Sequence, residues 1–447
     1  MMKLYLFLIM LMISSLMIKN LYMYMYMFIM LMIMMLLFII LNNLNNQFMS
    51  IYNWLGMDLM SYVLIILSIF IISLMYMISN KILNNKMFNL LMMMLLLSLM
   101  LSFNSMNYFM FYLFFEISLI PTFLLITMFG YQPERLNAGM YMMLYTLFAS
   151  LPLLLIIFML FYKYNSIMMF MLFNLIYNIN LINSFIFYFF MLFAFLVKLP
   201  MFMYHMWLPK AHVEAPVSGS MILAGVMLKL GGYGLIRSMS MMMKYSVKYN
   251  WMLIILNLMG MILLSMLCLR QIDLKVLVAY SSVVHMSMML SSMMLMLTFS
   301  KYSSIIMMLG HGFCSPAMFM LVNFFYERTC SRNLLINKGL INLFPSMMFM
   351  WFMFCIMNMG VPLSLNFISE LFIMFSLLSF SKNLILFLII SMLLSAMYSM
   401  YLFISINHGQ MNLLMKNLFN NKMLEFHSLI ILLIPLNFFF LKMDFMI

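Results

Sequence analysis

Apolar runs separated by short Asn-rich or charged segments follow one another along the whole chain. Most runs are about 20 residues long, which is enough for a helix to cross the ~30 Å hydrocarbon core of a bilayer. The segment 167–177 is too short to span a membrane, and we expect a loop or a piece lying at the membrane surface. The pattern predicts about fourteen transmembrane helices, at residues 4–18, 21–41, 54–79, 87–103, 105–129, 138–162, 181–204, 214–237, 251–269, 274–297, 303–326, 341–380, 383–406 and 426–441.

Two of these runs are interrupted at a proline. The first interruption is Lys198-Leu199-Pro200, and the second is Gly360-Val361-Pro362 in the run 341–380, which is too long for one straight span. Because proline removes a backbone donor, we predict broken helices near Pro200 and Pro362. For 341–380 we favour one helix broken in the middle over two helices. A broken helix in each half is typical of inverted-repeat transporters, whose ion path lies at the breaks.

Composition indicates a chain that is built for the membrane. Hydrophobic residues fill 68% of the 447 positions and charged residues only 7%, which is more apolar surface than a water-soluble domain can bury. The net charge of +13 lies mostly in short loops, where cations set topology and meet anionic lipid head groups. No basic patch carries interleaved stacking aromatics, so no nucleic-acid partner is expected. The predicted fold class is an all-α polytopic membrane protein.

Neither the cysteines nor the glycines indicate a bound metal, iron–sulfur cluster or nucleotide. The four cysteines show no CxxC spacing, and the glycine-rich stretch 231–234 follows a helix rather than a strand. The N-terminal run resembles a signal peptide, but it lacks a small-residue cleavage site and a second apolar run follows at once. We therefore expect a retained first helix. No cofactor or metal is predicted in this chain.

Charged side chains interrupt several of the predicted helices. A charge in lipid costs at least ~2.5–3.5 kcal/mol on the insertion scale, so each one needs a reason. Glu116 lies close before Pro121, and Lys198 is its natural partner beside Pro200. A static ion pair that pins two helices is one interpretation. We favour proton transfer, because backbone groups freed by the prolines recruit water.

Lys229 lies near the middle of the next apolar run. Gly225, Lys229 and Gly232 share one helix face, and glycine-mediated helix packing would explain the glycines but not the lysine. Snorkelling is the alternative, but about 12 Å of helix rise separate Lys229 from Arg237. The pattern favours a proton-relay role for Lys229.

Two histidines and a further acid continue this series. Serines at helical spacing accompany both His285 and His311, in successive predicted helices. A lone membrane histidine is often only packed and hydrogen-bonded, but two such polar stripes favour a hydrated path. Asn366 lies on the same face as Glu370, which could pass protons to one aqueous side. The alternative for Glu370 is a capping or interfacial acid.

The residues around Trp207 form a second tier of candidates. Their spacing suits a loop or half-helix more than a buried site, whereas His408 and His427 fit loop or rim positions. The first-tier proton relay comprises Glu116, Lys198, Lys229, His285, His311 and Glu370, and the second tier comprises His205, His212 and Glu214, with Lys210 nearby.

Four stretches of the chain resemble a known family. KLPMFMYHMWLPKAHVEAPVSGSMILAGVMLKLGGYGLIR is similar to the defining block of chain 4 of mitochondrial NADH:ubiquinone oxidoreductase, respiratory complex I. RQIDLKVLVAYSSVVHM, GHGFCSPAMF and GVPLSLNFISEL resemble the same family, and the resemblance covers nearly the whole chain. The sequence HMWLPKAHVEAP and the acid at Glu370 are similar to chain 4 rather than to the related chains 2 and 5.

The resemblance implies a fourteen-helix subunit with two inverted five-helix repeats. Its parts would be helices 1–3 at 1–86, the first repeat (helices 4–8) at 87–237, the second repeat (helices 9–13) at 238–406, and a C-terminal loop with helix 14 at 407–447. It also implies a role for each first-tier residue: an ion pair of Glu116 and Lys198, a central Lys229, a connecting axis with His285 and His311, and a terminal acid at Glu370.

The function implied by the resemblance is proton translocation in the mitochondrial inner membrane. Electron transfer from NADH to ubiquinone would drive pumping through the buried relay, while NADH, FMN, iron–sulfur clusters and ubiquinone bind other subunits. Partners would be the antiporter-like chains 2 and 5, accessory subunits and membrane lipids such as cardiolipin. Two alternatives remain: a stand-alone cation/proton antiporter, and a purely structural spacer.

Overall fold

The computed structural model describes residues 2–17, 23–42, 49–52, 54–79, 86–175, 184–410 and 421–440, most of which are helical. The chain folds into two compact units. Unit 1 comprises Met1–Leu199 and Glu214–Tyr249, and unit 2 comprises Pro200–Val213 and Asn250–Ile447.

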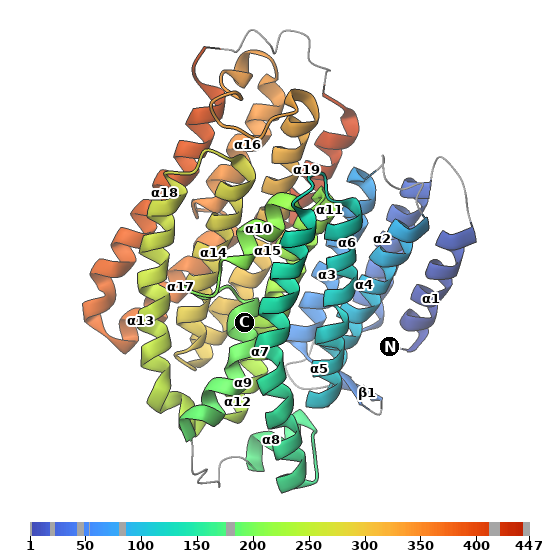
Figure 1. The fold of residues 1–447 in the computed structure, drawn as a ribbon, viewed down its shortest axis with the longest axis vertical. Coiled ribbons are helices and arrows are strands. Elements are labelled where there is room, and N and C mark those ends of the chain that lie inside the picture. The colour runs from blue at the N-terminus through green and yellow to red at the C-terminus, as the bar shows by residue number, and fades with distance from the viewer. Residues whose placement is uncertain are drawn as a thin grey trace. The chain divides into compact units, whose positions relative to one another are not determined.

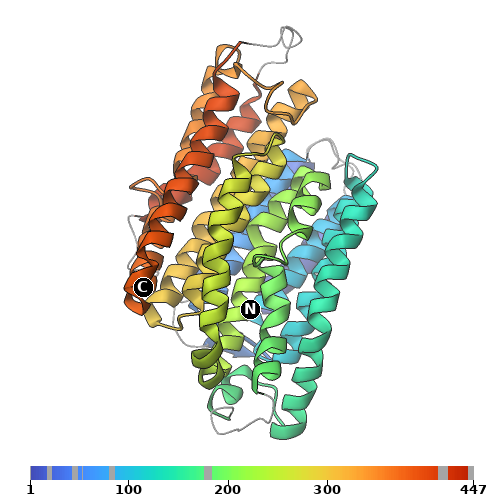
Figure 2. The same cartoon turned by 60° about the vertical axis from the view of Figure 1, so that its left-hand side comes forward.

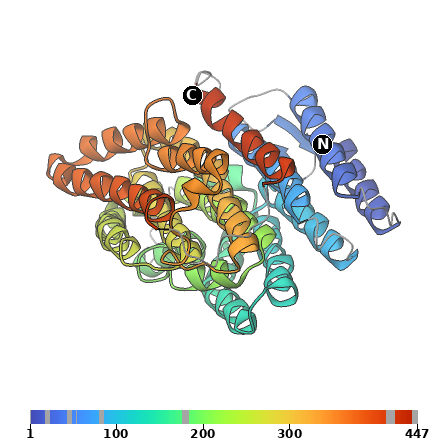
Figure 3. The ribbon, with the colours of Figure 1, turned by 90° about the horizontal axis from the view of Figure 1, so that it is seen from above.

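Unit 1 contains the N-terminal helices and one small hairpin. Helices α1 to α4 pack on one another and are the neighbouring blue ribbons of Figure 1, seen from above in Figure 3. The elements are α1 (Met2–Met17), α2 (Met23–Leu41), β1 (Met49–Tyr52), β2 (Leu55–Met57), α3 (Leu59–Ile78), α4 (Lys86–Asn104), α5 (Tyr108–Ile117), α6 (Leu119–Phe129), α7 (Arg135–Tyr164), α8 (Met169–Leu175), α9 (Ser184–Lys198), α11 (Val217–Ile222), the π-helix η2 (Leu223–Met227) and α12 (Leu228–Met241).

Unit 2 is built from helices alone in its described residues. Helix α15 packs against both α14 and α17, while α18 is the unbroken red-orange helix of Figure 2. Two helices, α10 (Trp207–Glu214) and α13 (Met243–Cys268), contribute residues to both units. The remaining elements are α14 (Leu274–Met293), α15 (Thr298–Thr329), η3 (Leu340–Asn342), α16 (Pro345–Asn358), α17 (Leu365–Phe380), η4 (Lys382–Leu384), α18 (Ile385–Asn407) and α19 (Met423–Phe438).

The structure confirms an all-α polytopic membrane protein. Among the described residues, ten helical stretches are long and apolar enough to cross a membrane, and five shorter apolar helices accompany them. The described part of the segment 167–177 forms the seven-residue helix α8, too short to span a bilayer. The run 54–79 becomes helical only at Leu59, because Leu55–Met57 pairs with β1 and Asp58 then caps α3. The Ser61 amide donates to Asp58 Oδ1 at 3.1 Å in this cap.

Both predicted interruptions are present. Helix α9 ends at Lys198, and turns lead past Pro200 to the two-turn helix α10. Helix α16 ends at Asn358, and α17 begins at Leu365. The second break contains Gly360 at φ +70° and Leu363 at φ +75°, values that only glycine adopts easily. Each break leaves helix-end backbone groups without partners in their own helix.

Candidate functional site

Glu116 lies near the end of α5 in unit 1. Both carboxylate oxygens are shielded from solvent, and neither has a hydrogen-bond partner among the described residues. Ser150 lies nearby, but its hydroxyl donates to the Leu147 carbonyl at 3.1 Å. Burying a carboxyl group without a hydrogen bond costs free energy. Local hydrogen bonding therefore does not explain the presence of this acid.

Lys198, the last residue of α9, is 2% exposed. Its ammonium group donates to the Phe115 carbonyl at 3.2 Å and lies 3.4 Å from the centroid of the Phe115 ring. Within the described part of unit 1, the pair with Glu116 is not closed, although the two charges act on each other electrostatically. The ion pair expected between them is therefore open here, with Phe115 holding the ammonium.

Glycines of α12 allow the broken end of α9 to approach closely. A Cβ atom added at Gly231 would lie 3.1 Å from the Leu199 amide nitrogen, and one added at Gly234 would overlap the Phe195 ring. Helix packing therefore accounts for Gly231 and Gly234.

Lys229 is completely buried in α12. Its ammonium group donates to the Ala224 carbonyl at 2.5 Å. Ala224 belongs to the π-helix η2. Short π-helical insertions are rare in proteins as a whole, but those that occur are often found at functional sites. Full burial shows that Lys229 does not snorkel to the surface.

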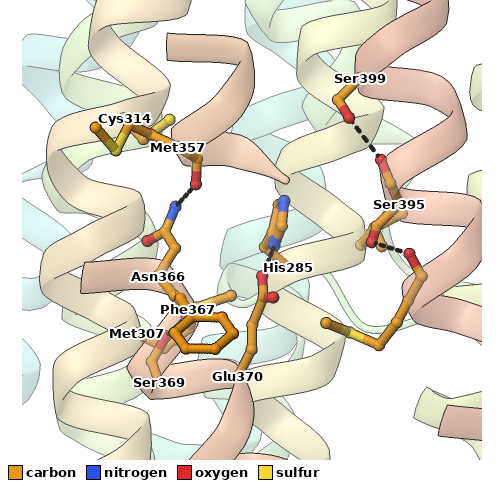
Figure 4. Close-up of polar contacts among 12 residues, drawn as sticks. His285, Met307, Cys314, Met357, Asn366, Phe367, Ser369, Glu370, Ser395 and Ser399 are labelled. Carbon is orange, nitrogen blue, oxygen red and sulfur yellow. Dashed lines mark hydrogen bonds and ion pairs between the residues drawn. The ribbon is translucent and has the colours of Figure 1, made fainter. Parts of the chain in front are cut away.

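His285 and Glu370 meet in unit 2. His285 Nδ1 lies 3.7 Å from Glu370 Oε1, with both side chains almost fully buried. Figure 4 shows the carboxylate pointing from α17 toward the imidazole of α14. A Cβ at Gly360 would lie 2.9 Å from the carboxyl carbon of Glu370 and closer still to Oε2. Glycine in the helix break therefore makes the space that the carboxylate occupies.

Two more side chains surround the imidazole of His285. The Tyr398 hydroxyl, from α18, lies 3.2 Å from His285 Nε2. The His311 ring lies 5.9 Å away, centroid to centroid, at an angle of 48°. His311 and Tyr398 are 2% and 0% exposed, so the group is enclosed. The structure thus brings together three of the six first-tier residues, His285, His311 and Glu370.

Asn366 supports the second break rather than extending the polar path. Its amide donates to the Met357 carbonyl of α16 at 2.9 Å (Figure 4). Gly310 of α15 leaves room for this side chain, because a Cβ there would collide with Asn366 Oδ1. Asn366 therefore satisfies a helix-end carbonyl that the break exposes.

The serines of the expected polar stripes donate to carbonyls of their own helices. Ser281 and Ser292 donate to carbonyls three residues earlier, and so does Ser304. Ser315 donates to the His311 carbonyl at 2.7 Å and lies 3.4 Å from His311 Nδ1. These hydroxyl donors are engaged locally, which is the common arrangement for serine in membrane helices.

His212 and Glu214 lie on the half-helix α10 and His205 lies in the turn before it, as predicted, but all three are buried, which the spacing did not predict. His205, His212 and Glu214 are 5%, 0% and 6% exposed. The His212 ring stacks on Phe319 at 4.7 Å, and the Val213 carbonyl accepts a hydrogen bond from Arg332 at 2.8 Å. Half-helix α10 is thus held by α15 and by the segment that follows it.

Sequence reasoning missed two polar features of the interior. Tyr398 is one of 25 tyrosines and lies in an apolar helix, so no local signal marks it. Asp58 forms an ion pair of 2.5 Å with Arg237, whose guanidinium lies 4.8 Å from the centroid of the Tyr233 ring. These residues lie 179 positions apart. Among the described residues, no cluster of His, Cys, Asp or Glu is arranged to hold a metal ion.

Comparisons with known proteins agree with this architecture. Residues 105–397 match the family model described as NADH:quinone oxidoreductase/Mrp antiporter, TM, and residues 1–103 match that of NADH-ubiquinone oxidoreductase chain 4, amino terminus. The chain is 46% identical to NADH-ubiquinone oxidoreductase chain 4 of Ceratitis capitata, covering 91% of each chain. It is 45% identical to that of Locusta migratoria, covering 87% of each.

Solved structures share the fold at much lower identity. A chain of respiratory complex I from Thermus thermophilus matches with a TM-score of 0.85 and 19% identity, over 97% of this chain and 93% of that one. A chain of the Mrp complex from Dietzia sp. matches with 0.87 and 17%, over 99% of this chain and 51% of that one. The resemblance seen in the sequence is confirmed, and the chain belongs to the NADH-ubiquinone oxidoreductase chain 4 family.

Proposed function

We propose that this chain translocates protons within respiratory complex I, through the buried acid, lysine and histidine side chains described above. The observation that carries the proposal is the enclosed contact of His285 and Glu370 in unit 2, beside the ring of His311. Three enclosed titratable groups in membrane helices are costly unless they exchange protons or pair permanently. Within unit 1, Lys198 and Lys229 are equally buried.

The open pair in unit 1 supplies a way to drive transfer. At an effective dielectric constant of 20, two unit charges attract by ~4 kcal/mol at 4 Å and by ~2 kcal/mol at 8 Å. Moving Glu116 and Lys198 apart over this range would therefore make the charged form of Lys198 less favourable by ~2 kcal/mol, and moving them together would do the reverse. A change of 1.36 kcal/mol alters a proton-transfer equilibrium tenfold. Such a movement would push a proton toward Lys229.

The path then continues from Lys229 to His285 and His311 and ends at Glu370. Electron transfer from NADH to ubiquinone in other subunits would supply the energy, and those subunits would hold the FMN, the iron–sulfur clusters and the quinone. We further propose fourteen transmembrane helices with inverted repeats at 87–237 and 238–406. The chain would lie in the mitochondrial inner membrane beside chains 2 and 5, accessory subunits and lipids such as cardiolipin.

Complex I that carries Lys229→Ala and is reconstituted into liposomes tests this function. We expect NADH-driven proton uptake to fall sharply, because the relay loses its central base. Lys382→Ala, at an exposed lysine before α18, is the control and should pump normally. Normal pumping and assembly with Lys229→Ala would instead favour the structural spacer.

A stand-alone antiporter is the second candidate, supported by the likeness to the Mrp complex chain. It predicts sodium- or potassium-linked proton flux in liposomes that contain this chain without its redox partners. Flux only in the NADH-fed complex would reject it.

A further inference from the structure

Tyr398 is a buried titratable residue to which the function above gives no role. It is 0% exposed on α18, and its hydroxyl lies 3.2 Å from His285 Nε2. The other ring nitrogen of His285 faces Glu370 at 3.7 Å. The imidazole therefore lies between a phenol and a carboxylate, contributed by three different helices.

A phenol suits this place because its hydroxyl both donates and accepts hydrogen bonds. When His285 is doubly protonated, Nδ1–H faces Glu370 and Nε2–H donates to the Tyr398 oxygen. When the Nδ1 proton passes to Glu370, the remaining proton stays on Nε2, which keeps donating to Tyr398. In the other neutral tautomer, with the proton on Nδ1, the Tyr398 hydroxyl donates to Nε2, so the contact survives in every state of the ring.

We infer that Tyr398 is a positioning residue, which holds the imidazole of His285 against Glu370 in both of its protonation states. The inference rests on the proposed function, because it deepens the last transfer step of that path. Tyr398 itself neither gains nor loses a proton in this scheme. A ring that keeps one orientation passes its proton without a rotation between the two states.

Tyr398→Phe in reconstituted complex I removes one oxygen atom and keeps the ring. We expect NADH-driven proton uptake to slow about two- to tenfold, which corresponds to the loss of one hydrogen bond. The matched control is Tyr401→Phe on the same helix, where the side chain is 39% exposed, and it should leave uptake unchanged.

The solvent deuterium isotope effect on uptake is the second measurement. It should rise in Tyr398→Phe, because transfer at a misaligned imidazole becomes slower, and as a ratio it does not depend on the amount of assembled complex. An unchanged isotope effect, or a rate equal to that of Tyr401→Phe, would overturn the inference. Glu370→Gln separates the two proposals: full pumping there would reject the proposed function, whereas loss of pumping beside a normal Tyr398→Phe would reject the role of Tyr398 alone.

Discussion

Gly360→Ala is a sharp test of how the second helix break shapes the site. An alanine Cβ would lie 2.9 Å from the carboxyl carbon of Glu370, where ordinary contacts begin near 3.4 Å. The carboxylate must therefore move, and Oε2, which lies closer to the Cβ, moves further, by about 1 Å. Glu370 Oε1 starts 3.7 Å from His285 Nδ1, and a shift of the carboxylate by about 1 Å changes the attraction between the two groups by ~1 kcal/mol at an effective dielectric constant of 20. The corresponding change in a proton-transfer equilibrium is about fivefold.

The same substitution also strains the backbone, which needs its own control. A left-handed φ costs a non-glycine residue ~1–2 kcal/mol. Gly409 has φ +108°, and a Cβ there would meet the Lys338 side chain at an ordinary 3.6 Å. Gly409→Ala therefore carries the backbone cost without the collision at the carboxylate.

The assay compares proton uptake per NADH oxidised with the thermal unfolding of the complex for both variants. We expect both to unfold at somewhat lower temperature and only Gly360→Ala to lose proton yield. Equal yields from the two variants would show that the position of the Glu370 carboxylate does not matter, and the argument from geometry would be refuted.

Three further substitutions address other parts of the interior. Arg237→Leu leaves the mostly buried Asp58 without its counter-ion, so we expect a loss of about 3–5 kcal/mol, measured by thermal unfolding and largely reversed when Asp58→Asn is added, which removes the charge but keeps the cap of α3. Gly310→Ala should push Asn366 off its carbonyl partner and cost about 1–3 kcal/mol, and an unchanged unfolding temperature would contradict that packing. Glu116→Gln keeps the shape of the side chain but not its charge, so we expect normal assembly with sharply reduced proton uptake, and normal uptake would exclude Glu116 from the relay.

Much of the fold could be predicted because hydrophobic length alone specifies a spanning helix. The run beginning at 274 starts its helix there, and both proline-marked interruptions are present. The exception at 54–79 is instructive. Residues Leu55–Met57 are uncharged like the helix that follows, and pairing with β1 makes them extended. Hydropathy cannot report such a pairing, because strand partners are chosen by tertiary context.

The site could be predicted only as a set of residues, not as a set of contacts. A charge inside an apolar run is conspicuous, so the sequence alone predicts Glu116, Lys229 and Glu370 as candidates. The hydroxyl of Tyr398 is not conspicuous, because tyrosine is common in this chain and its ring is compatible with lipid. The contact of the Lys198 ammonium with the carbonyl and ring of Phe115 could not be predicted either, because it depends on how α9 ends beside α5.

The two helix breaks act in different ways on the titratable groups beside them. Lys198 is the last residue of α9, where the helix end carries partial negative charge and favours a cation. Glu370 lies beyond the break, in the second turn of α17, and side chains on a helix lean toward its N-terminus. The carboxylate therefore reaches back over the break, and Gly360 is what lets it fit there. The first break thus stabilises the charge of Lys198 through its backbone, while the second makes space for the carboxylate of Glu370. Replacing Pro200 should therefore disturb proton transfer through the electrostatics of the helix end, and replacing Gly360 should disturb it through a steric collision.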